Sequence, residues 1–313
     1  MAKLKTKIPD WIKKDVSLGQ SNTFRIKTKT SYLAIISNKK QLIKSLQWAK
    51  ANSLPFFILG NGSNILFAGE KYPGLIIKIR NNRIRKIDSQ TIIAPAGIML
   101  ELLLGKFIKM EYQGLEWVSG IPGTLGGAVY GNAGAFGNEM SQIVKKVKTI
   151  NTETYKEKTY LLKDCQFKYR DSIFKKNKEI IWTVEIFIKK GKKEKIIEQA
   201  RENRNYKTQR GLFKYPSAGS VFKNIYAKEV AEKYRKQAKI QGGKISAGWF
   251  IDQCGLKGTK IGGAMISDFH ANIIINFNEA TAKNILDLIS FCKEKVFKKF
   301  KIKLQEEIIV IHY

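Results

Sequence analysis

Two kinds of apolar spacing alternate along the chain, and together they predict a mixed α and β protein. Where apolar residues recur every three or four positions, we expect helices that bury one face. Where apolar and polar residues alternate, or a short apolar run ends at turn residues, we expect strands. One expected helix begins at Ser37 or Asn38, and the other expected helices cover 98–110, 192–206 and 279–300. We expect one or two strands within 22–36, and further strands at 54–59, 65–69, 75–79, 84–87, 91–94, 143–150, 180–188, 272–276 and 308–311.

Residues 114–137 fit neither pattern. This stretch reads GLEWVSGIPGTLGGAVYGNAGAFG and holds eight of the 25 glycines. Glycine loses the most conformational entropy on folding, so we expect the stretch neither to fill a core nor to form a regular helix. Close approach of the backbone to a ligand is what offsets that loss. We therefore predict that the stretch forms one wall of a cofactor site.

The residues between these glycines support the same interpretation. Ser119, Thr124 and Asn132 are small and polar, which suits hydrogen bonding to phosphate, ribose or a ring carbonyl. The alternative is a long, mobile glycine loop. Apolar residues among the glycines, such as Trp117 and Leu125, argue against that alternative, because flexible linkers lack such anchors.

A second glycine-rich turn, GNGSN at 60–64, follows the apolar run LPFFIL at 54–59. A strand followed by glycines suggests a dinucleotide-binding fingerprint. The third glycine of that fingerprint is missing, however, and residues 65–69 predict a strand where the fingerprint needs a helix. What remains is a tight turn between two strands, which offers backbone N–H groups and the Ser63 hydroxyl to a phosphate.

The composition places the chain among ordinary globular proteins. Its 313 residues are enough for two or three domains, and 43% of them are hydrophobic. No signal peptide is visible and no apolar run approaches the length of a membrane span, so we expect a cytoplasmic protein with no membrane insertion. Three separated cysteines and two histidines predict neither a disulfide framework nor a metal site.

A formal net charge of +31 raises the alternative of a nucleic-acid-binding protein. The lysines, however, are spread from Lys3 to Lys303, and neither a zinc-finger spacing nor an RNA-binding aromatic signature accompanies them. We therefore expect no specific nucleic-acid partner. A diffuse positive field would still attract an anionic substrate or NADPH.

Seven short motifs occur in a fixed order and carry a resemblance that extends from Asn22 to Ile311. They are GNGSN (60–64), the glycine-rich stretch (114–137), YRDS (169–172), PSAGSVFKN (216–224), AGWFID (247–252), GLKG (255–258) and LQEEI (304–308). With these motifs the chain resembles the UDP-N-acetylenolpyruvoylglucosamine reductases, also called UDP-N-acetylmuramate dehydrogenases. Its short span between Ile188 and Ser217 is similar to that of the second, shorter subtype.

The resemblance implies an α+β fold and a flavin-dependent reaction. The family has a two-lobed FAD-binding domain of the vanillyl-alcohol-oxidase type, followed by an α+β substrate-binding domain. This implies lobe 1 at 1–80, lobe 2 at 81–205 and the substrate domain at 206–313. In the family's reaction NADPH, the co-substrate, reduces the cofactor FAD, and hydride then passes to the enolpyruvyl group of a UDP-sugar, giving UDP-N-acetylmuramate for peptidoglycan precursors. We expect a monomer. Another flavin oxidoreductase of the same fold, with a different substrate, is the remaining alternative.

By motif, the resemblance assigns three catalytic residues. Ser220 would protonate C2 of a carbanion-like intermediate, while Arg170 and Glu307 would stabilise the charge that develops on the substrate carboxylate. Each assignment has a simpler alternative. Arg170 could form a surface ion pair with Asp171, and Ser220 could be a turn residue. The residue types alone do not show whether Glu306 or Glu307 has this role. The position of the glutamate within the family's motif assigns it to Glu307.

The same motifs imply which residues hold the cofactor and the substrate. The implied FAD-binding residues are Gly60, Asn61, Gly62, Ser63, Asn64, Ser119, Gly120, Pro122, Gly123, Thr124, Gly126, Gly127 and Asn132, and the implied substrate-binding residues are Lys207 and Asn224.

Overall fold

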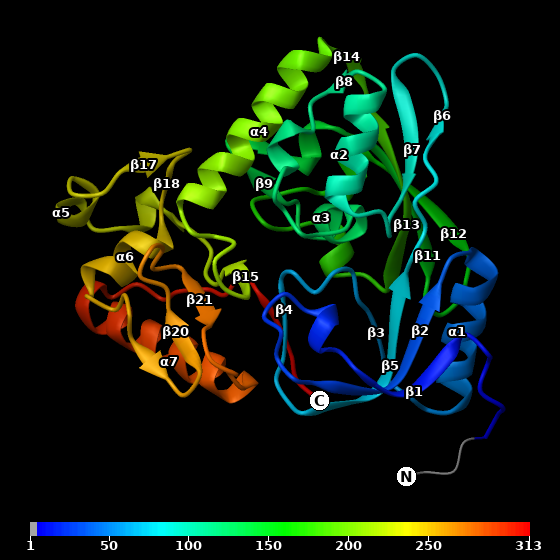
Figure 1. Cartoon of the computed structure of the whole chain (residues 1–313), viewed down its shortest axis with the longest axis horizontal. Coiled ribbons are helices and arrows are strands. Elements are labelled where there is room, and N and C mark those ends of the chain that lie inside the picture. Colours follow the sequence, from blue (N-terminus) through cyan, green and yellow to red (C-terminus); the bar gives the residue numbers. More distant parts are fainter. Residues whose placement is uncertain (1–4) are drawn as a thin grey trace. The chain divides into compact units, whose positions relative to one another are not determined.

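The computed structural model describes residues 5–313, which divide into two compact units (Figure 1). The first unit comprises the chain up to Val16, Thr30–Asn61 and Pro73–Tyr206; the second comprises Ser17–Lys29, Gly62–Tyr72 and Lys207–Tyr313. Each unit is therefore assembled from three separated segments of the chain.

One part of the first unit is a helix on a four-stranded sheet. The strands follow the order β1-β2-β5-β3, and β3 runs parallel to β5. Leu42 and Leu46 of helix α1 are buried in one cluster with Ile36, Leu75 and Ile77 of the sheet. The helix begins where the sequence predicts it, because the Asn38 side chain accepts a hydrogen bond from the Gln41 N–H at 2.9 Å. The elements are β1 (Ile12–Ser17), β2 (Lys29–Ile36), α1 (Lys39–Ala51), β3 (Phe56–Ile58) and β5 (Lys71–Ile79).

The other part of the first unit is built on a five-stranded antiparallel sheet of order β12-β11-β13-β7-β6. Helices α2 and α3 contribute Leu103, Leu125 and Val129 to a core that also contains Val147 and Val184 of the sheet. The elements are β6 (Arg85–Lys86), β7 (Thr91–Pro95), α2 (Leu100–Lys109), β8 (Tyr112–Gln113), α3 (Leu125–Tyr130), β9 (Gly134–Ala135), β10 (Asn138–Glu139), β11 (Val144–Asn151), β12 (Glu157–Leu161), β13 (Glu179–Phe187) and β14 (Lys189–Lys190), and α4 (Lys193–Gln209) follows them.

The second unit is built on a four-stranded sheet of order β15-β21-β20-β19 and on the long helix α7. Phe24, Ile26 and Leu66, from its two N-terminal segments, are buried in one cluster with Phe250 of α6 and Leu288 of α7. A parallel pair, β4 and β22, joins the segment after Gly62 to the C-terminus. The elements are β4 (Ile65–Phe67), β15 (Ser217–Ser220), β16 (Ile225–Tyr226), α5 (Glu232–Arg235), β17 (Ile240–Gln241), β18 (Lys244–Ile245), α6 (Ala247–Gln253), β19 (Lys260–Ile261), β20 (Ala264–Ile266), β21 (Ile273–Asn276), α7 (Ala282–Phe300) and β22 (Ile309–Ile311).

One expectation about the glycine-rich stretch 114–137 is wrong. Within it, α3 is a regular helical segment, and Trp117 and Val118 belong to the core of the first unit. The physical reason is that the helix buries Leu125, Ala128 and Val129 on one face. Gly126, which follows Leu125, allows close packing because a Cβ there would lie only 2.8 Å from the Cβ of Ala96.

Two further points concern the chain's organisation. Within residues 5–313, no helix combines the length and the apolar character that a membrane span needs. The division into 1–80, 81–205 and 206–313 stays a prediction, and its first four residues lie outside the described part of the chain.

A pair of glycine substitutions tests the packing of the first unit. A Cβ on Gly74, in β5, would overlap the Pro55 carbonyl oxygen, so we expect Gly74→Ala to lower the free energy of unfolding by about 1–3 kcal/mol. In the matched control Gly105→Ala, the new Cβ meets no atom within 4 Å on the exposed side of α2. This control should stabilise the protein by roughly 0.5–1 kcal/mol. Chemical denaturation measures both, and equal stability of the two variants would contradict the packing described here.

Candidate active site

The two glycine-rich motifs of the sequence meet in the first unit. The Asn61 side chain donates a hydrogen bond from Nδ2 to the Pro122 carbonyl oxygen at 2.7 Å. A Cβ on Gly60 would lie only 2.6 Å from Thr124 Oγ1, so only glycine allows this approach. Residues 60–61 and 122–124 therefore lie against each other, as the prediction of a shared cofactor site requires.

Hydrogen bonds to helices α2 and α3 hold the backbone of the loop that contains Gly120, Gly123 and Thr124. The Gly120 N–H donates to the Glu101 carboxylate, and the Leu100 N–H donates to the Gly123 carbonyl oxygen at 2.9 Å. Thr124 begins α3 by accepting a hydrogen bond from the Gly127 N–H at 3.3 Å. The loop is thus fixed before any ligand arrives.

The loop also keeps donors for a ligand. Within residues 5–313, the backbone N–H groups of Gly60, Asn61 and Gly123 have no acceptor in the protein. Free N–H groups on a glycine-rich backbone suit an anionic group such as the pyrophosphate of FAD. The residues present in the first unit therefore fit the predicted cofactor.

The rest of the GNGSN motif belongs to the second unit. Gly62 has a φ of 64°, and a Cβ there would overlap the Ser21 carbonyl oxygen. The Asn64 side chain donates to the Glu307 carbonyl oxygen at 3.0 Å, and the Asn64 carbonyl oxygen accepts from the Ile309 N–H at 2.9 Å. The Asn64 amide therefore positions the segment that carries Glu307.

Arg170 lies against the glycine-rich stretch of the first unit. Its Nη2 donates to the Gly134 carbonyl oxygen at 3.0 Å, and its guanidinium lies 5.3 Å from the centre of the Tyr169 ring. Its backbone is left-handed, with a φ of 54°, which is costly for a residue with a Cβ. Asp171, its predicted alternative partner, forms an ion pair with Lys176 at 3.5 Å. The Arg170 side chain is therefore held against the glycine-rich stretch, and its role in the reaction stays a prediction.

Asn132 joins the glycine-rich stretch to the loop that carries Arg170. Its side chain is fully buried, with Nδ2 donating to the Lys168 carbonyl oxygen and Oδ1 accepting from the Ser141 N–H, both at 3.0 Å. The Ser172 hydroxyl adds a second link by donating to the Tyr130 carbonyl oxygen at 2.7 Å. The Asn132 amide is predicted to bind the cofactor, and in the structure it binds protein at both ends.

The environment keeps Tyr130 neutral. Burial raises the pKa of the Tyr130 phenol above its ordinary value, and the carboxylate of Asp171 raises it further. The phenol beside the Arg170 loop is therefore a neutral hydrogen-bonding group at any physiological pH.

Ser220 and Glu307 come together in the second unit. Ser220 ends strand β15 and pairs with Ile273 of β21. The next residue, Val221, accepts a hydrogen bond at its carbonyl oxygen from the Glu307 N–H at 2.7 Å. The Glu306 carboxylate forms an ion pair with the Lys293 ammonium group, so Glu306 has a structural role. The role of Glu307 in the reaction stays a prediction.

No motif in the sequence indicates the residue that fixes the Ser220 segment. Asn272 is 2% exposed, and its side chain donates to the Phe222 carbonyl oxygen at 2.8 Å and accepts from the Phe222 N–H at 2.9 Å. The Asn272 N–H in turn donates to His270 Nδ1 at 3.2 Å. Burial lowers the pKa of His270, and the charge of Arg210 lowers it further. In the sequence, Asn272 was only the first residue of an expected strand.

The two predicted substrate-binding residues are both in the second unit. Lys207 lies in the last turn of α4 and is 8% exposed, which is rare for a lysine. Asn224 accepts a hydrogen bond at Oδ1 from the Ala247 N–H at 3.2 Å, and so holds the start of helix α6. Their contacts with a substrate stay predictions.

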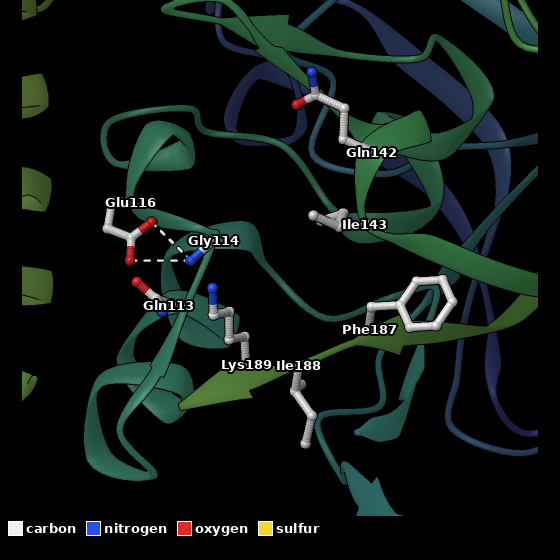
Figure 2. Close-up of a pocket in the computed structure, with 8 residues that line it drawn as sticks. All are labelled: Gln113, Gly114, Glu116, Gln142, Ile143, Phe187, Ile188 and Lys189. Carbon is white, nitrogen blue, oxygen red and sulfur yellow. Dashed lines mark hydrogen bonds between the residues drawn. The ribbon is translucent and has the colours of Figure 1, made fainter. Parts of the chain in front are cut away.

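One cavity in the first unit is a separate feature. It has a volume of about 400 Å³, and Figure 2 shows Lys189 and Phe187 on its wall and the Glu116 carboxylate turned toward the Gly114 N–H. The residues that line it include none of the predicted site residues. Among the described residues, no group of three or more His, Cys, Asp or Glu side chains could hold a metal ion.

Comparison with known proteins identifies the domains. Residues 30–154 match the family model of an FAD binding domain, and residues 211–311 match that of the UDP-N-acetylenolpyruvoylglucosamine reductase C-terminal domain. These matches and the mixed helices and strands confirm the expected fold class: an FAD-binding domain of the vanillyl-alcohol-oxidase type followed by an α+β domain.

Full-length relatives agree with the domain matches. The chain is 34% identical to the UDP-N-acetylenolpyruvoylglucosamine reductase of Alkaliphilus oremlandii, over 96% of this chain and 94% of that protein. It is 35% identical to the reductase of Carboxydothermus hydrogenoformans, over 99% and 98%. The crystal structure of the reductase from Thermus caldophilus superposes with a TM-score of 0.75 at 28% identity, covering 95% of this chain and 98% of that one.

The role of Asn272 can be tested by removing its amide. In Asn272→Ala the buried N–H and carbonyl groups of Phe222 lose their partner, so we expect the free energy of unfolding to fall by roughly 2–4 kcal/mol. The exposed Asn278 provides the control, since Asn278→Ala should stay within about 0.5 kcal/mol of the parent protein. Denaturant titration measures both; an Asn272→Ala protein as stable as the control would show that the bridge to Phe222 contributes little.

Proposed function

Since the chain belongs to the UDP-N-acetylenolpyruvoylglucosamine reductase family, we propose that it reduces the enolpyruvyl group of UDP-N-acetylglucosamine-enolpyruvate to UDP-N-acetylmuramate, with NADPH as the reductant. The match to reductases over nearly the whole chain, with an FAD binding domain inside it, carries this proposal. The product would enter peptidoglycan precursor synthesis, and the enzyme would work as a monomer in the cytoplasm.

The chain is an FAD-dependent oxidoreductase. When bound, FAD supplies the two-electron reduction of the substrate double bond. We assign the FAD pyrophosphate to the free N–H groups of Gly60, Asn61 and Gly123, because glycine and proline keep side chains away from that backbone. Gly126, Gly127 and Asn132 support the wall behind it.

We assign Arg170 to the carboxylate of the substrate. Reduction of the enol ether drives negative charge onto this carboxylate, and a guanidinium that is already in place balances the charge without reorganising. The hydrogen bond from Arg170 to Gly134 and its left-handed backbone support this role, since both restrict where the guanidinium can point. A net charge of +31 also favours the approach of anionic reactants.

Glu307 is assigned to the same carboxylate. Two ionised carboxylates repel each other, so for Glu307 to stabilise this carboxylate a proton must lie between the two carboxyl groups. The backbone bonds of Glu307 to Val221 and Asn64 hold its position in the second unit and support this assignment.

Ser220 is assigned as the proton donor. Reduction at one carbon of the double bond leaves a basic carbon at C2, and the Ser220 hydroxyl transfers its proton to that carbon. A hydroxyl is a weak acid in water, but it is acidic enough for so basic a carbon. The segment around Ser220 is pinned by Asn272 and by Glu307, which supports a role that depends on position.

An activity assay tests the proposed reaction. The purified protein should be yellow from bound FAD and should oxidise NADPH only when the enolpyruvyl UDP-sugar is present, with UDP-N-acetylmuramate as the product. Absorbance at the flavin and NADPH bands measures both. Flavin without turnover of this sugar would point to another flavin oxidoreductase, and a colourless protein that shifts duplex DNA would contradict the proposal altogether.

The two half-reactions separate the role of Ser220 from a role in folding. In Ser220→Ala, we expect NADPH to reduce the flavin at the parent rate, while reduction of the UDP-sugar slows by roughly 10²–10⁴-fold. Ser217→Ala, on the same strand β15, is the matched control and should leave both rates unchanged. Stopped-flow absorbance measures each half-reaction, and an equal loss of both rates in Ser220→Ala would rule out Ser220 as the proton donor.

A further inference from the structure

The turn that carries Arg170 places this residue where glycine or asparagine is usually found. Lys168 and Asp171 pair through two backbone hydrogen bonds, at 3.0 Å from the Lys168 N–H and at 3.1 Å from the Asp171 N–H. Tyr169 and Arg170 are therefore the two central residues of the turn, and Arg170 has a φ of 54°. A positive φ at the second central residue favours glycine or asparagine, because a Cβ there is crowded by the backbone. An arginine at this position must be held by other contacts.

The peptide unit between Arg170 and Asp171 is held at both of its polar ends. Its N–H donates to the Lys168 carbonyl oxygen. Its carbonyl oxygen, that of Arg170, accepts a hydrogen bond from the Lys175 ammonium group at 2.7 Å. A hydrogen bond from a charged donor is stronger than one between neutral groups. Because the plane of this peptide sets ψ of Arg170, the Lys175 ammonium group fixes the backbone from which the guanidinium projects.

The position of Lys175 is itself fixed by its surroundings. Lys175 ends a short 3₁₀ helix, Ile173–Lys175, and the preceding Phe174 side chain is buried in the core of the first unit. The Lys175 ammonium group also lies 5.9 Å from the centre of the Tyr130 ring at the end of α3. Lys175 therefore joins the Arg170 turn to the helix that supports the proposed cofactor wall.

Two neighbouring lysines make a different kind of contact. Lys176 pairs with Asp171 at 3.5 Å and Lys178 pairs with Glu153 at 2.6 Å, and both lysine side chains are largely exposed. Exposed ion pairs of this kind contribute little to stability. Lys175 is half-buried and donates to a backbone oxygen, so its contact restricts the chain in a way that the other two do not.

We propose that Lys175 is a positioning residue, which sets the direction of the Arg170 guanidinium through the Arg170 carbonyl oxygen. The side chain of Arg170 completes the arrangement, since its Nη2 donates to the Gly134 carbonyl oxygen at 3.0 Å. The inference rests on the proposed function, which assigns Arg170 to the substrate carboxylate. A guanidinium in a fixed direction meets the developing charge without reorganising, so an error in its direction slows reduction of the UDP-sugar. Reduction of the flavin by NADPH has no such requirement.

The two half-reactions of the FAD-loaded enzyme test this role. In Lys175→Met, which keeps the length of the side chain but removes its donor, we expect reduction of the UDP-sugar to slow roughly 10–10²-fold while NADPH reduces the flavin at the parent rate. Lys175→Arg, which restores a charged donor, should recover most of the lost rate. Lys178→Met is the matched control and should leave both rates unchanged. Stopped-flow absorbance measures each half-reaction, and an equal loss of both rates in Lys175→Met, or no loss at all, overturns the proposal.

A double-mutant cycle shows whether Lys175 acts through Arg170. In an Arg170→Ala background, Lys175→Met should cause no further loss in the reduction of the UDP-sugar, because the guanidinium that it positions is absent. A further loss as large as the one measured in the parent enzyme contradicts the proposal.

Amide hydrogen exchange tests the turn independently of the reaction. The Asp171 N–H should exchange roughly tenfold faster in Lys175→Met than in the parent, and at the parent rate in Lys178→Met. An Asp171 N–H that exchanges at the parent rate in Lys175→Met refutes the positioning role at any level of activity. If this N–H exchanges faster and the parent enzyme turns over no UDP-sugar, the proposed function fails while the positioning of Arg170 by Lys175 stands.

Discussion

The close approach of Gly60 to Thr124 is the contact on which the proposed cofactor site of the first unit depends. With a Cβ on Gly60 only 2.6 Å from the Thr124 hydroxyl, the GNGSN turn could not lie against the loop that begins α3. The hydrogen bond from the Asn61 amide to the Pro122 carbonyl oxygen then fixes the distance between the turn and the loop. The backbone on this wall keeps free N–H groups. These groups suit a pyrophosphate without the help of a charged side chain.

Buried asparagine side chains fix, in both units, the segments to which we assign catalytic residues. Asn132 holds the loop of Arg170 in the first unit, and Asn272 holds the segment after Ser220 in the second. A primary amide suits this task because it offers a donor and an acceptor and can bridge two backbone groups at once. Such bridges fix position without adding a charge that would disturb the electrostatics of the reaction.

Three residues in the glycine-rich stretch or in the loop bonded to it have left-handed backbone. Asn132, Phe136 and Arg170 all have positive φ although each carries a Cβ. Left-handed backbone at such residues persists only where surrounding contacts impose it. Here the contacts are the Asn132 amide, the β9–β10 pairing and the Arg170 bond to Gly134.

The sequence by itself determined the family and most of the longer helices and strands, because these rest on motif order and on local spacing. The tertiary structure alone decided that α3 forms inside the glycine-rich stretch and that Glu306 is bound by Lys293. It also revealed the bridges of Asn132 and Asn272, whose partners lie 36 and 50 residues away. Hydrogen bonds across such distances leave no periodic trace in a sequence, since only the folded chain brings donor and acceptor together.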